Sequence, residues 1–340
     1  MRSLSLPLLL AATACRVEVG SPSGPVTADC PGAEPEGEVW VYTSMYPHVV
    51  ERFEALVRER HPNLEPSFFQ AGSEKVAQRV EAEWAAGSSP ACVLLTSDPF
   101  WYAKLDAEGR LQPYLPPTSL RIDRSLVDPD GAWLAARLSL MVLAANGDRV
   151  PEAERPTAFS DLTGPAFRDR FTMGDPLASG TNFTLLSFWA EEPGWDWVDA
   201  LQANGLVAAG GGSAVLQRLD SGERPVGAIL LENLLAAPHT SAVPIFPTDG
   251  AVVIPGPVAI TAGCPNPVAA RAIVDLLMSD EGQAVIVEGD MYAALPEVPP
   301  PDGAPRLGDI AVRTWGPGFV ERVSTDAGAI KDRWAALVSR

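Results

Sequence analysis

Residues 175–189 hold the side chains best suited to binding an anion. They read Asp-Pro-Leu-Ala-Ser-Gly-Thr-Asn-Phe-Thr-Leu-Leu-Ser-Phe-Trp, and a helix is predicted to begin at Ser179, Gly180, Thr181 and Asn182. The first turn of a helix has backbone N–H groups without intrahelical partners, and Ser or Thr adds a hydroxyl there. The positive end of the helix dipole attracts negative charge as well. The sequence therefore indicates an anion site, and the alternative is an ordinary helix cap that satisfies only its own helix.

Polar residues also follow each of the first three predicted strands, which are 38–42, 64–69 and 91–95. Helical patterns separate these strands, and such strand–helix alternation predicts a parallel α/β sheet. Ligands of open α/β sheets bind beyond the carboxyl ends of the strands, so we expect the three polar turns to meet at one crevice. The candidate ligand-binding residues from these turns are Ser44, Ser73, Glu74, Thr96, Ser97 and Asp98.

A carboxylate and an amide, Glu232 and Asn233, follow the predicted buried strand 226–231. These groups suit hydroxyls or an ammonium group, so we expect them to face the end of the ligand away from its anion. Tyr46 is a further candidate that would form an aromatic wall, although simple packing is the alternative. The Gly-rich run 210–213 has no strand directly before it and no Lys after it, which favours a flexible turn.

Composition limits the classes of function. The chain has 340 residues, 46% of them hydrophobic, 20% charged, and a formal net charge of -18. Such an acidic chain repels nucleic acid and anionic membrane surfaces, so both are excluded as general partners. The three histidines are scattered and no hydrolase or zinc motif is present, so we predict neither catalysis, nor a cofactor, nor a metal.

The N-terminus predicts export. Arg2 precedes an apolar run too short to span a bilayer, which is typical of a signal segment. Small residues directly before Cys15 resemble a lipoprotein cleavage site, so residues 1–15 are predicted as the signal segment, with Cys15 lipidated as the only membrane attachment. A plain signal peptide is the alternative. Residues 16–37 are rich in Pro, Gly and Ser and predict a flexible tether. The remaining cysteines are Cys30, Cys92 and Cys264, and one pair could form a disulfide.

Two long β-rich runs, 133–145 and 243–260, predict crossings between two lobes. We place 38–137 and 255–340 in lobe 1 and 138–254 in lobe 2, with a last helix over 329–338. A cleft between lobes linked by extended strands favours hinge closure on a ligand. The predicted fold class is thus α/β, with each lobe a mainly parallel sheet flanked by helices.

Five segments together resemble the extracellular solute-binding proteins of ABC importers, in particular the ferric-iron, phosphonate and sugar-phosphate group. They are Val39-Trp-Val-Tyr-Thr-Ser44, Gln70-Ala-Gly-Ser-Glu-Lys75, Val93-Leu-Leu-Thr-Ser-Asp98, Asp175-Pro-Leu-Ala-Ser-Gly-Thr181 and Leu277-Met-Ser-Asp-Glu-Gly-Gln283. The resemblance implies a type 2 periplasmic-binding fold that delivers a solute to a permease and its ATPase.

Ferric members of that group bring a pair of tyrosines to the position that here reads Leu231-Glu-Asn-Leu-Leu235. The resemblance therefore implies a small anionic organic solute, with a phosphate or phosphonate group held by hydroxyls and N–H groups. Ferric iron or an iron chelate is one alternative ligand, and an exported hydrolase is an alternative function. We predict a monomer in the periplasm or on the outer cell surface.

Overall fold

The computed structural model describes residues 34–315 and 318–339, and the part after Glu34 forms one compact unit. The predicted signal segment, Cys15, Cys30 and most of the predicted tether lie outside the described residues. No helix in the described part has the length and apolar character needed to cross a bilayer.

One mixed sheet runs through the whole unit, with its main strands in the order β2-β1-β3-β10-β5-β8-β6-β7. Strands β1, β2 and β3 are parallel at one end, and β6, β7 and β8 are parallel at the other. The strands are β1 Gly37–Thr43, β2 Leu64–Gln70, β3 Ala91–Leu95, β4 Leu111–Gln112, β5 Leu134–Asn146, β6 Phe171–Met173, β7 Val207–Ala208, β8 Val226–Leu230, β9 Ala242–Ile245, β10 Ala251–Thr261, β11 Tyr292–Ala293 and β12 Val312–Arg313.

The predicted crossing 133–145 corresponds to the long strand β5, and the predicted crossing 243–260 divides into the short strand β9 and the long strand β10; β5 and β10 lie at the centre of the sheet. Every residue of both strands is buried, which explains their apolar sequences. We expected them only to link two sheets, but they also pair with each other antiparallel, with Ser139 opposite Ile254. The parallel end segments are therefore joined into one sheet through an antiparallel centre.

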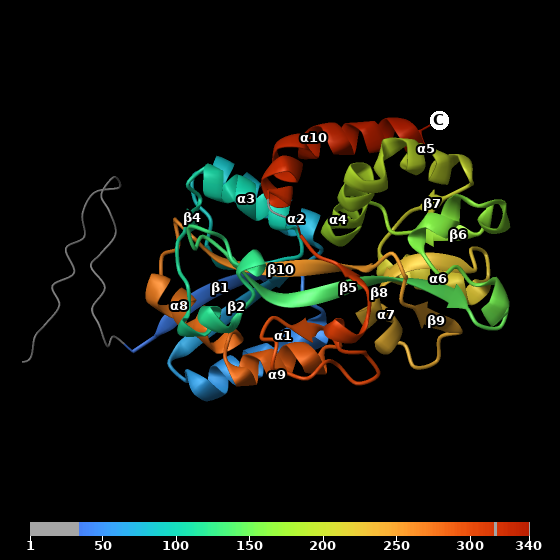
Figure 1. Ribbon diagram of the computed structural model, residues 1–340. Helices are drawn as coiled ribbons and strands as arrows, with labels where there is room; N and C mark the ends of the chain where they lie inside the picture. The colour runs from blue at the N-terminus through green and yellow to red at the C-terminus, as the bar shows by residue number, and fades with distance from the viewer. Residues whose placement is uncertain (1–33, 316–317, 340) are drawn as a thin grey trace, which may run out of the picture. The chain divides into compact units, whose positions relative to one another are not determined.

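Helices cover both faces of this sheet (Figure 1). They are α1 Pro47–Arg60, α2 Ser73–Ala85, α3 Pro99–Ala107, α4 Gly180–Trp189, α5 Trp195–Ala203, α6 Gly212–Ser221, α7 Leu231–Leu235, α8 Pro267–Leu277, α9 Asp280–Glu288 and α10 Phe319–Val338. The last of these begins ten residues earlier than predicted and lies across α3 and α5. The helix α10 therefore contacts both halves of the unit: the first half, built around β1, β2 and β3, and the second half, built around β6, β7 and β8.

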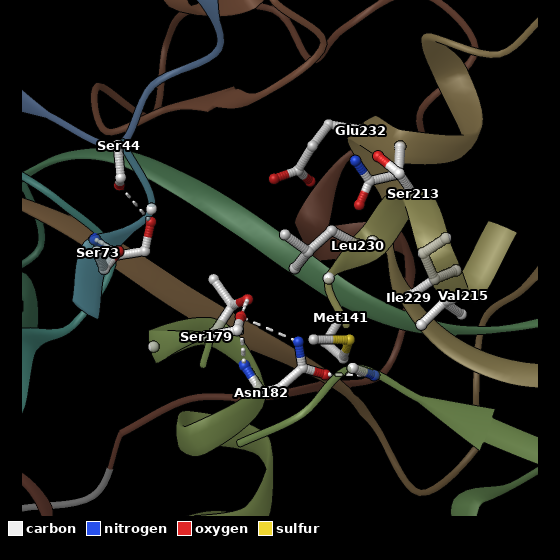
Figure 2. A pocket seen from close by; sticks show the side chains of 18 of the residues that line it. Ser44, Ser73, Met141, Ser179, Asn182, Ser213, Val215, Ile229, Leu230 and Glu232 are labelled. Atoms are coloured by element: carbon white, nitrogen blue, oxygen red, sulfur yellow. Dashed lines mark hydrogen bonds between the residues drawn. The ribbon is translucent and has the colours of Figure 1, made fainter. Parts of the chain in front are cut away.

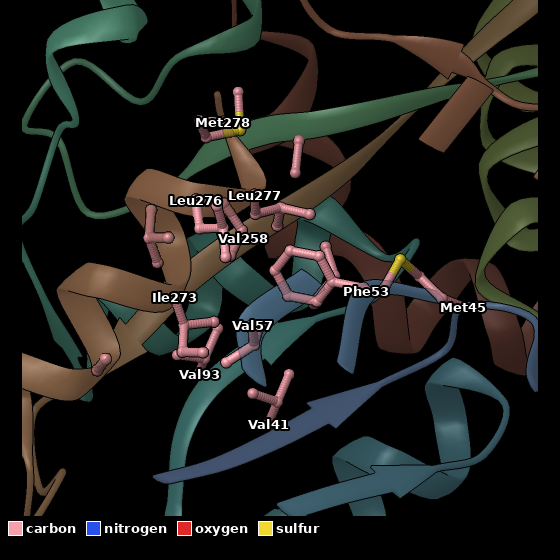
Figure 3. Packing of buried hydrophobic residues seen from close by; sticks show 14 of the residues in the cluster. Val41, Met45, Phe53, Val57, Val93, Val258, Ile273, Leu276, Leu277 and Met278 are labelled. Atoms are coloured by element: carbon pink, nitrogen blue, oxygen red, sulfur yellow. The ribbon is translucent and has the colours of Figure 1, made fainter. Parts of the chain in front are cut away.

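The core of the first half packs α1 and α8 against the sheet (Figure 3). Phe53 and Val57 from α1 meet Ile273 and Leu277 from α8 over Val41 of β1, and all five side chains are almost fully buried. This apolar contact explains the helical spacing of hydrophobic residues in both segments.

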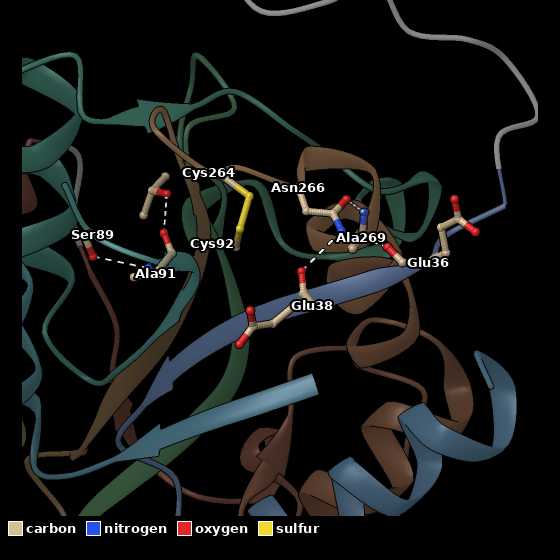
Figure 4. The surroundings of a disulfide bond; sticks show 9 residues. Glu36, Glu38, Ser89, Ala91, Cys92, Cys264, Asn266 and Ala269 are labelled. Atoms are coloured by element: carbon tan, nitrogen blue, oxygen red, sulfur yellow. Dashed lines mark hydrogen bonds between the residues drawn. A yellow bond between two sulfur atoms is a disulfide. The ribbon is translucent and has the colours of Figure 1, made fainter. Parts of the chain in front are cut away.

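A disulfide joins Cys92 of β3 to Cys264, which follows β10 (Figure 4). The sequence left the choice of pair open. Nearby, the Asn266 side chain caps α8 by accepting from the N–H of Ala269, and it donates to the carbonyl of Glu36. These contacts fix the start of β1 against the start of α8.

Candidate functional site

A cavity of about 260 Å³ lies beyond the ends of β1, β3 and β8, between the two halves of the unit. Its lining is mostly small and polar on one side and apolar on the other. The residues are Ser44, Tyr46, Gly72, Ser73, Ser97, Arg137, Met141, Gly174, Ala178, Ser179, Gly180, Thr181, Asn182, Gly211, Gly212, Ser213, Val215, Ala228, Ile229, Leu230, Glu232 and Asn233. Ten of the thirteen predicted ligand-binding residues are among them.

The first wall comes from the ends of β1 and β3 and from the start of α2. The hydroxyl oxygens of Ser44 and Ser97 are 3.3 Å apart, and the Ser73 hydroxyl accepts from the N–H of Ser97 at 3.2 Å. Ser73 lies in the first turn of the thirteen-residue helix α2, whose positive end therefore faces the cavity. These hydroxyls can donate to an anion without bringing a countercharge.

The second wall is the start of α4, as the sequence predicted for its helix boundary. The Ser179 hydroxyl accepts from the Asn182 side chain at 3.0 Å, and it lies 3.0 Å from the Thr181 hydroxyl. Asn182 in turn accepts from the N–H of Gly174 at 3.1 Å, which ties the helix start to the end of β6. Figure 2 shows Ser179 and Asn182 across the cavity from Ser44 and Ser73.

A buried guanidinium, Arg137 of β5, also lines the cavity. It donates to the hydroxyls of Ser97 at 2.6 Å and Ser139 at 2.8 Å, and its Nε atom has no partner in the structure. Only 3% of Arg137 is exposed, and burial lowers its pKa from the usual value. It is the one cationic side chain among the described lining residues.

A buried carboxylate, Glu232 of α7, points into the cavity (Figure 2). It is 2% exposed and its Oε1 atom has no hydrogen-bond partner in the structure. Burial raises its pKa, while Ser139 and the positive charge of Arg137 act in the opposite direction. An unpartnered buried acceptor favours a ligand that brings a donor, such as a hydroxyl or an ammonium group.

A cross-cavity hydrogen bond links the two halves at the rim. Asn233 donates to the Tyr46 hydroxyl at 2.9 Å. The starts of α6 and α7 approach closely here, because a Cβ added to Gly212 would lie 2.2 Å from the Asn233 side chain. The Gly-rich run 210–213 was predicted as a flexible turn. In the structure it leads into α6, and Gly211, Gly212 and Ser213 line the cavity.

Three predicted site residues do not line the cavity: Glu74, Thr96 and Asp98. Each points into the protein or toward α10. Glu74 pairs with Lys331 of α10 at 3.0 Å, and Asp98 caps α3 by accepting from the N–H groups of Phe100 and Trp101. The Thr96 side chain is fully buried. The predicted turns do meet at one crevice, but only one or two residues of each face it.

Arg137 was not among the residues predicted from the sequence to bind ligand. The signal was available, because a lone Arg within the apolar run 133–145 must find a partner for a buried charge. The apolar wall formed by Met141, Val215, Ile229 and Leu230 was missed for a different reason. Such residues have the same pattern in any buried strand or helix, and only the fold shows which of them face a cavity.

The model of the bacterial extracellular solute-binding protein family matches residues 90–313. The chain belongs to this family. A curated relative, the probable ABC transporter periplasmic-binding protein y4fP of Sinorhizobium fredii, is 27% identical over 223 residues. The matched region spans 62% of this chain and 62% of that relative.

Solved structures share the fold across nearly their whole length. Iron-bound HitA from Pseudomonas aeruginosa has a TM-score of 0.78 at 17% identity, and the match covers 87% of this chain and 98% of that one. AfuA from Actinobacillus pleuropneumoniae, with exogenous fructose-6-phosphate bound, has a TM-score of 0.77 at 21% identity and covers 89% and 99%. The two-lobed type 2 periplasmic-binding fold predicted from the sequence is thereby confirmed.

Proposed function

We propose that this solute-binding protein captures a small organic solute carrying a phosphate or phosphonate group and delivers it to the permease of an ABC importer. The cavity between the two halves supports this proposal because it combines one buried cation with neutral donors at two helix starts. Arg137 and the Ser179–Thr181 turn together form the observation on which the proposal rests. Helix starts and hydroxyls bind oxyanions well.

The composition of the lining favours such a ligand over a ferric ion. A hard cation such as the ferric ion prefers several anionic oxygen ligands. The described lining offers one phenol, Tyr46, and one carboxylate, Glu232. Burial raises the pKa of Tyr46, which opposes the phenolate that a ferric ion would need. Arg137 would also repel a cation.

The other end of the ligand would face Glu232 and the apolar wall. An acceptor without a partner beside Met141 and Leu230 suits a compact carbon skeleton with a hydroxyl or an ammonium group. A sugar phosphate and an aminoalkyl phosphonate both satisfy this description.

A thermal-shift screen followed by calorimetry tests the proposal. We expect sugar phosphates, alkyl phosphonates or phosphodiesters to raise the melting temperature, because a ligand that binds the folded state stabilises it. The non-phosphorylated sugars are the matched controls and should have no effect. A response to ferric citrate without a response to any phosphorylated compound would refute the proposal.

The double variant Ser179→Ala with Thr181→Ala tests the anion site directly. Both hydroxyls lie at the cavity, and the Ser179 hydroxyl also caps α4 by accepting from Asn182. We expect binding of the phosphorylated compound to be lost, while loss of the cap lowers the free energy of unfolding by only about 1 kcal/mol and the fold is retained. The matched control is Ser187→Ala on the same helix, whose hydroxyl donates to the Phe183 carbonyl away from the cavity.

We further propose that Cys15 anchors the exported protein to the membrane through a lipid. The support is the sequence alone, because Cys15 lies outside the described residues. In cells, Cys15→Ser should move the protein from the membrane fraction to the soluble fraction. Retention in the membrane fraction would argue against lipidation.

A further inference from the structure

The starts of α2, α3 and α4 meet beside the cavity, and the carboxylates of Glu74 and Asp98 lie among them. Ser73 and Ser97 line the cavity, and the residues that follow them, Glu74 and Asp98, are acidic. The start of α4 packs directly on this region, because a Cβ added to Gly180 would lie 2.9 Å from Cβ of Asp98. Two negative charges so near an anion site would repel the anion unless a cation offsets them.

The C-terminal helix supplies that cation. The ammonium group of Lys331 is 3.0 Å from Oε1 of Glu74, and the two side chains are 31% and 19% exposed. The same ammonium group lies 4.8 Å from the ring centroid of Phe183, which is in α4 and almost fully buried. Lys331 therefore contacts α2 and α4, whose first turns form opposite walls of the cavity.

The electrostatics of Asp98 agree with this geometry. Its pKa is raised to about 6, mainly by burial and then by the charge of Glu74, whereas the charge of Lys331 acts in the opposite direction. All three groups thus interact with one another in the fold. Lys331 offsets the charge of both carboxylates.

The position of α10 is set by other contacts, so Lys331 is presented on a fixed support. The ring of Phe319 packs on Phe100 of α3, with centroids 5.8 Å apart, and the Ser324 hydroxyl donates to the Phe100 carbonyl at 3.1 Å. At the other end, Trp334 is buried in the core of the second half. A helix held in this way keeps Lys331 between α2 and α4.

We propose that Lys331 is a positioning residue for anion capture. It holds Glu74 turned away from the cavity, offsets the negative charge beside it, and ties the first turn of α2 to α4. The effect on ligand affinity rests on the proposed function, whereas the effect on the two helix starts does not.

The test uses Lys331→Met, Lys331→Arg and the double variant Lys331→Met with Glu74→Gln. The matched control is Lys104→Met, which removes another lysine paired with a glutamate of α2, Glu81, at 3.0 Å but on the exposed surface. The first measurement is amide hydrogen exchange in the ligand-free protein at residues 76–79 of α2 and 183–186 of α4, the first amides of these helices that donate to backbone carbonyls. The second is calorimetric titration with fructose 6-phosphate.

We expect Lys331→Met to speed exchange in both helix starts and to weaken binding of fructose 6-phosphate about tenfold, which corresponds to about 1.4 kcal/mol. Lys331→Arg should keep both properties close to wild type. The double variant should regain most of the affinity, because no uncompensated carboxylate remains at position 74, while its exchange stays fast. Lys104→Met should change neither measurement.

Unchanged exchange in both helix starts of Lys331→Met would overturn the proposal, as would an affinity loss that Glu74→Gln fails to restore. If wild-type protein binds no phosphorylated compound, the proposed function fails. The exchange measurement then still decides whether Lys331 ties α2 to α4.

Discussion

Arg137→Met removes the one cation from the described lining of the cavity while keeping a side chain of similar length. The guanidinium donates at 2.6 Å to Ser97 and at 2.8 Å to Ser139, and it is almost fully buried. Two consequences follow. The anion loses a charged partner, and Glu232 loses the positive charge that opposes its protonation.

The size of each effect can be estimated. A unit charge about 4 Å from an anion contributes about 4 kcal/mol at an effective dielectric constant of about 20. The serine hydroxyls released by the substitution can donate to the anion instead, so we expect about half of this to be lost, or about 30-fold in Kd. The substitution also removes two hydrogen bonds to serine and the attraction between the charges of Arg137 and Glu232, so we expect it to lower the free energy of unfolding by about 2 kcal/mol, less than the loss of a close buried ion pair.

Calorimetry with fructose 6-phosphate and with fructose measures the first effect, and urea unfolding measures the second. Arg52→Met is the matched control, since it removes an arginine whose partner, Glu288, is exposed. It should leave both quantities unchanged. A Kd for fructose 6-phosphate within twofold of wild type in Arg137→Met would refute the reasoning, because the guanidinium would then not act on the anion.

Three further predictions concern charge and cross-linking. Glu232→Gln should weaken binding of fructose 6-phosphate but not of inorganic phosphate, as measured by calorimetry, and equal losses for both would contradict its assignment to the non-phosphate end. Asp98→Asn should stabilise the protein at pH 7–8. The pKa of Asp98 is raised from 3.8 to about 6, mainly by burial, so its protonated carboxyl favours folding below pH 3.8. That contribution to the free energy of unfolding, at most about 3 kcal/mol, is lost as the pH rises to 6. Urea unfolding at pH 3.5 and pH 8 should show the gain only at pH 8, and a gain at both would point to packing instead. Reduction of the Cys92–Cys264 disulfide should lower stability by about 2–5 kcal/mol, because the bridge closes a long loop with a sequence separation of 172, and an unchanged melting temperature in dithiothreitol would disprove this.

The sequence was informative where one local rule decided the structure. The strands β3, β5 and β8 were recognised from apolar runs, and the start of α4 from a Ser–Gly–Thr turn. The turns after β1, β2 and β3 were expected at one crevice because parallel strands must end together.

The sequence was less informative where contacts distant in the chain decided the outcome. The helix α10 begins at Phe319 although Gly328 interrupts its pattern, since Phe319, Val323 and Trp334 gain burial that outweighs the cost of glycine in a helix. Likewise, Glu74 and Asp98 follow cavity-facing serines, but Lys331 and the α3 cap draw them elsewhere. Glu74 and Lys331 are 257 residues apart in the sequence, so no local pattern could predict their contact.

Gly180 is a position in the cavity wall at which a larger residue would push two elements apart. The structure leaves no room for a methyl group there, because it would press on Cβ of Asp98 at 2.9 Å and on the carbonyl of Ser97 at 3.1 Å. An alanine at this position would force the start of α4 away from the loop before α3. Because Gly180 belongs to the cavity lining, such a variant should change the spacing between these two walls without removing a polar side chain.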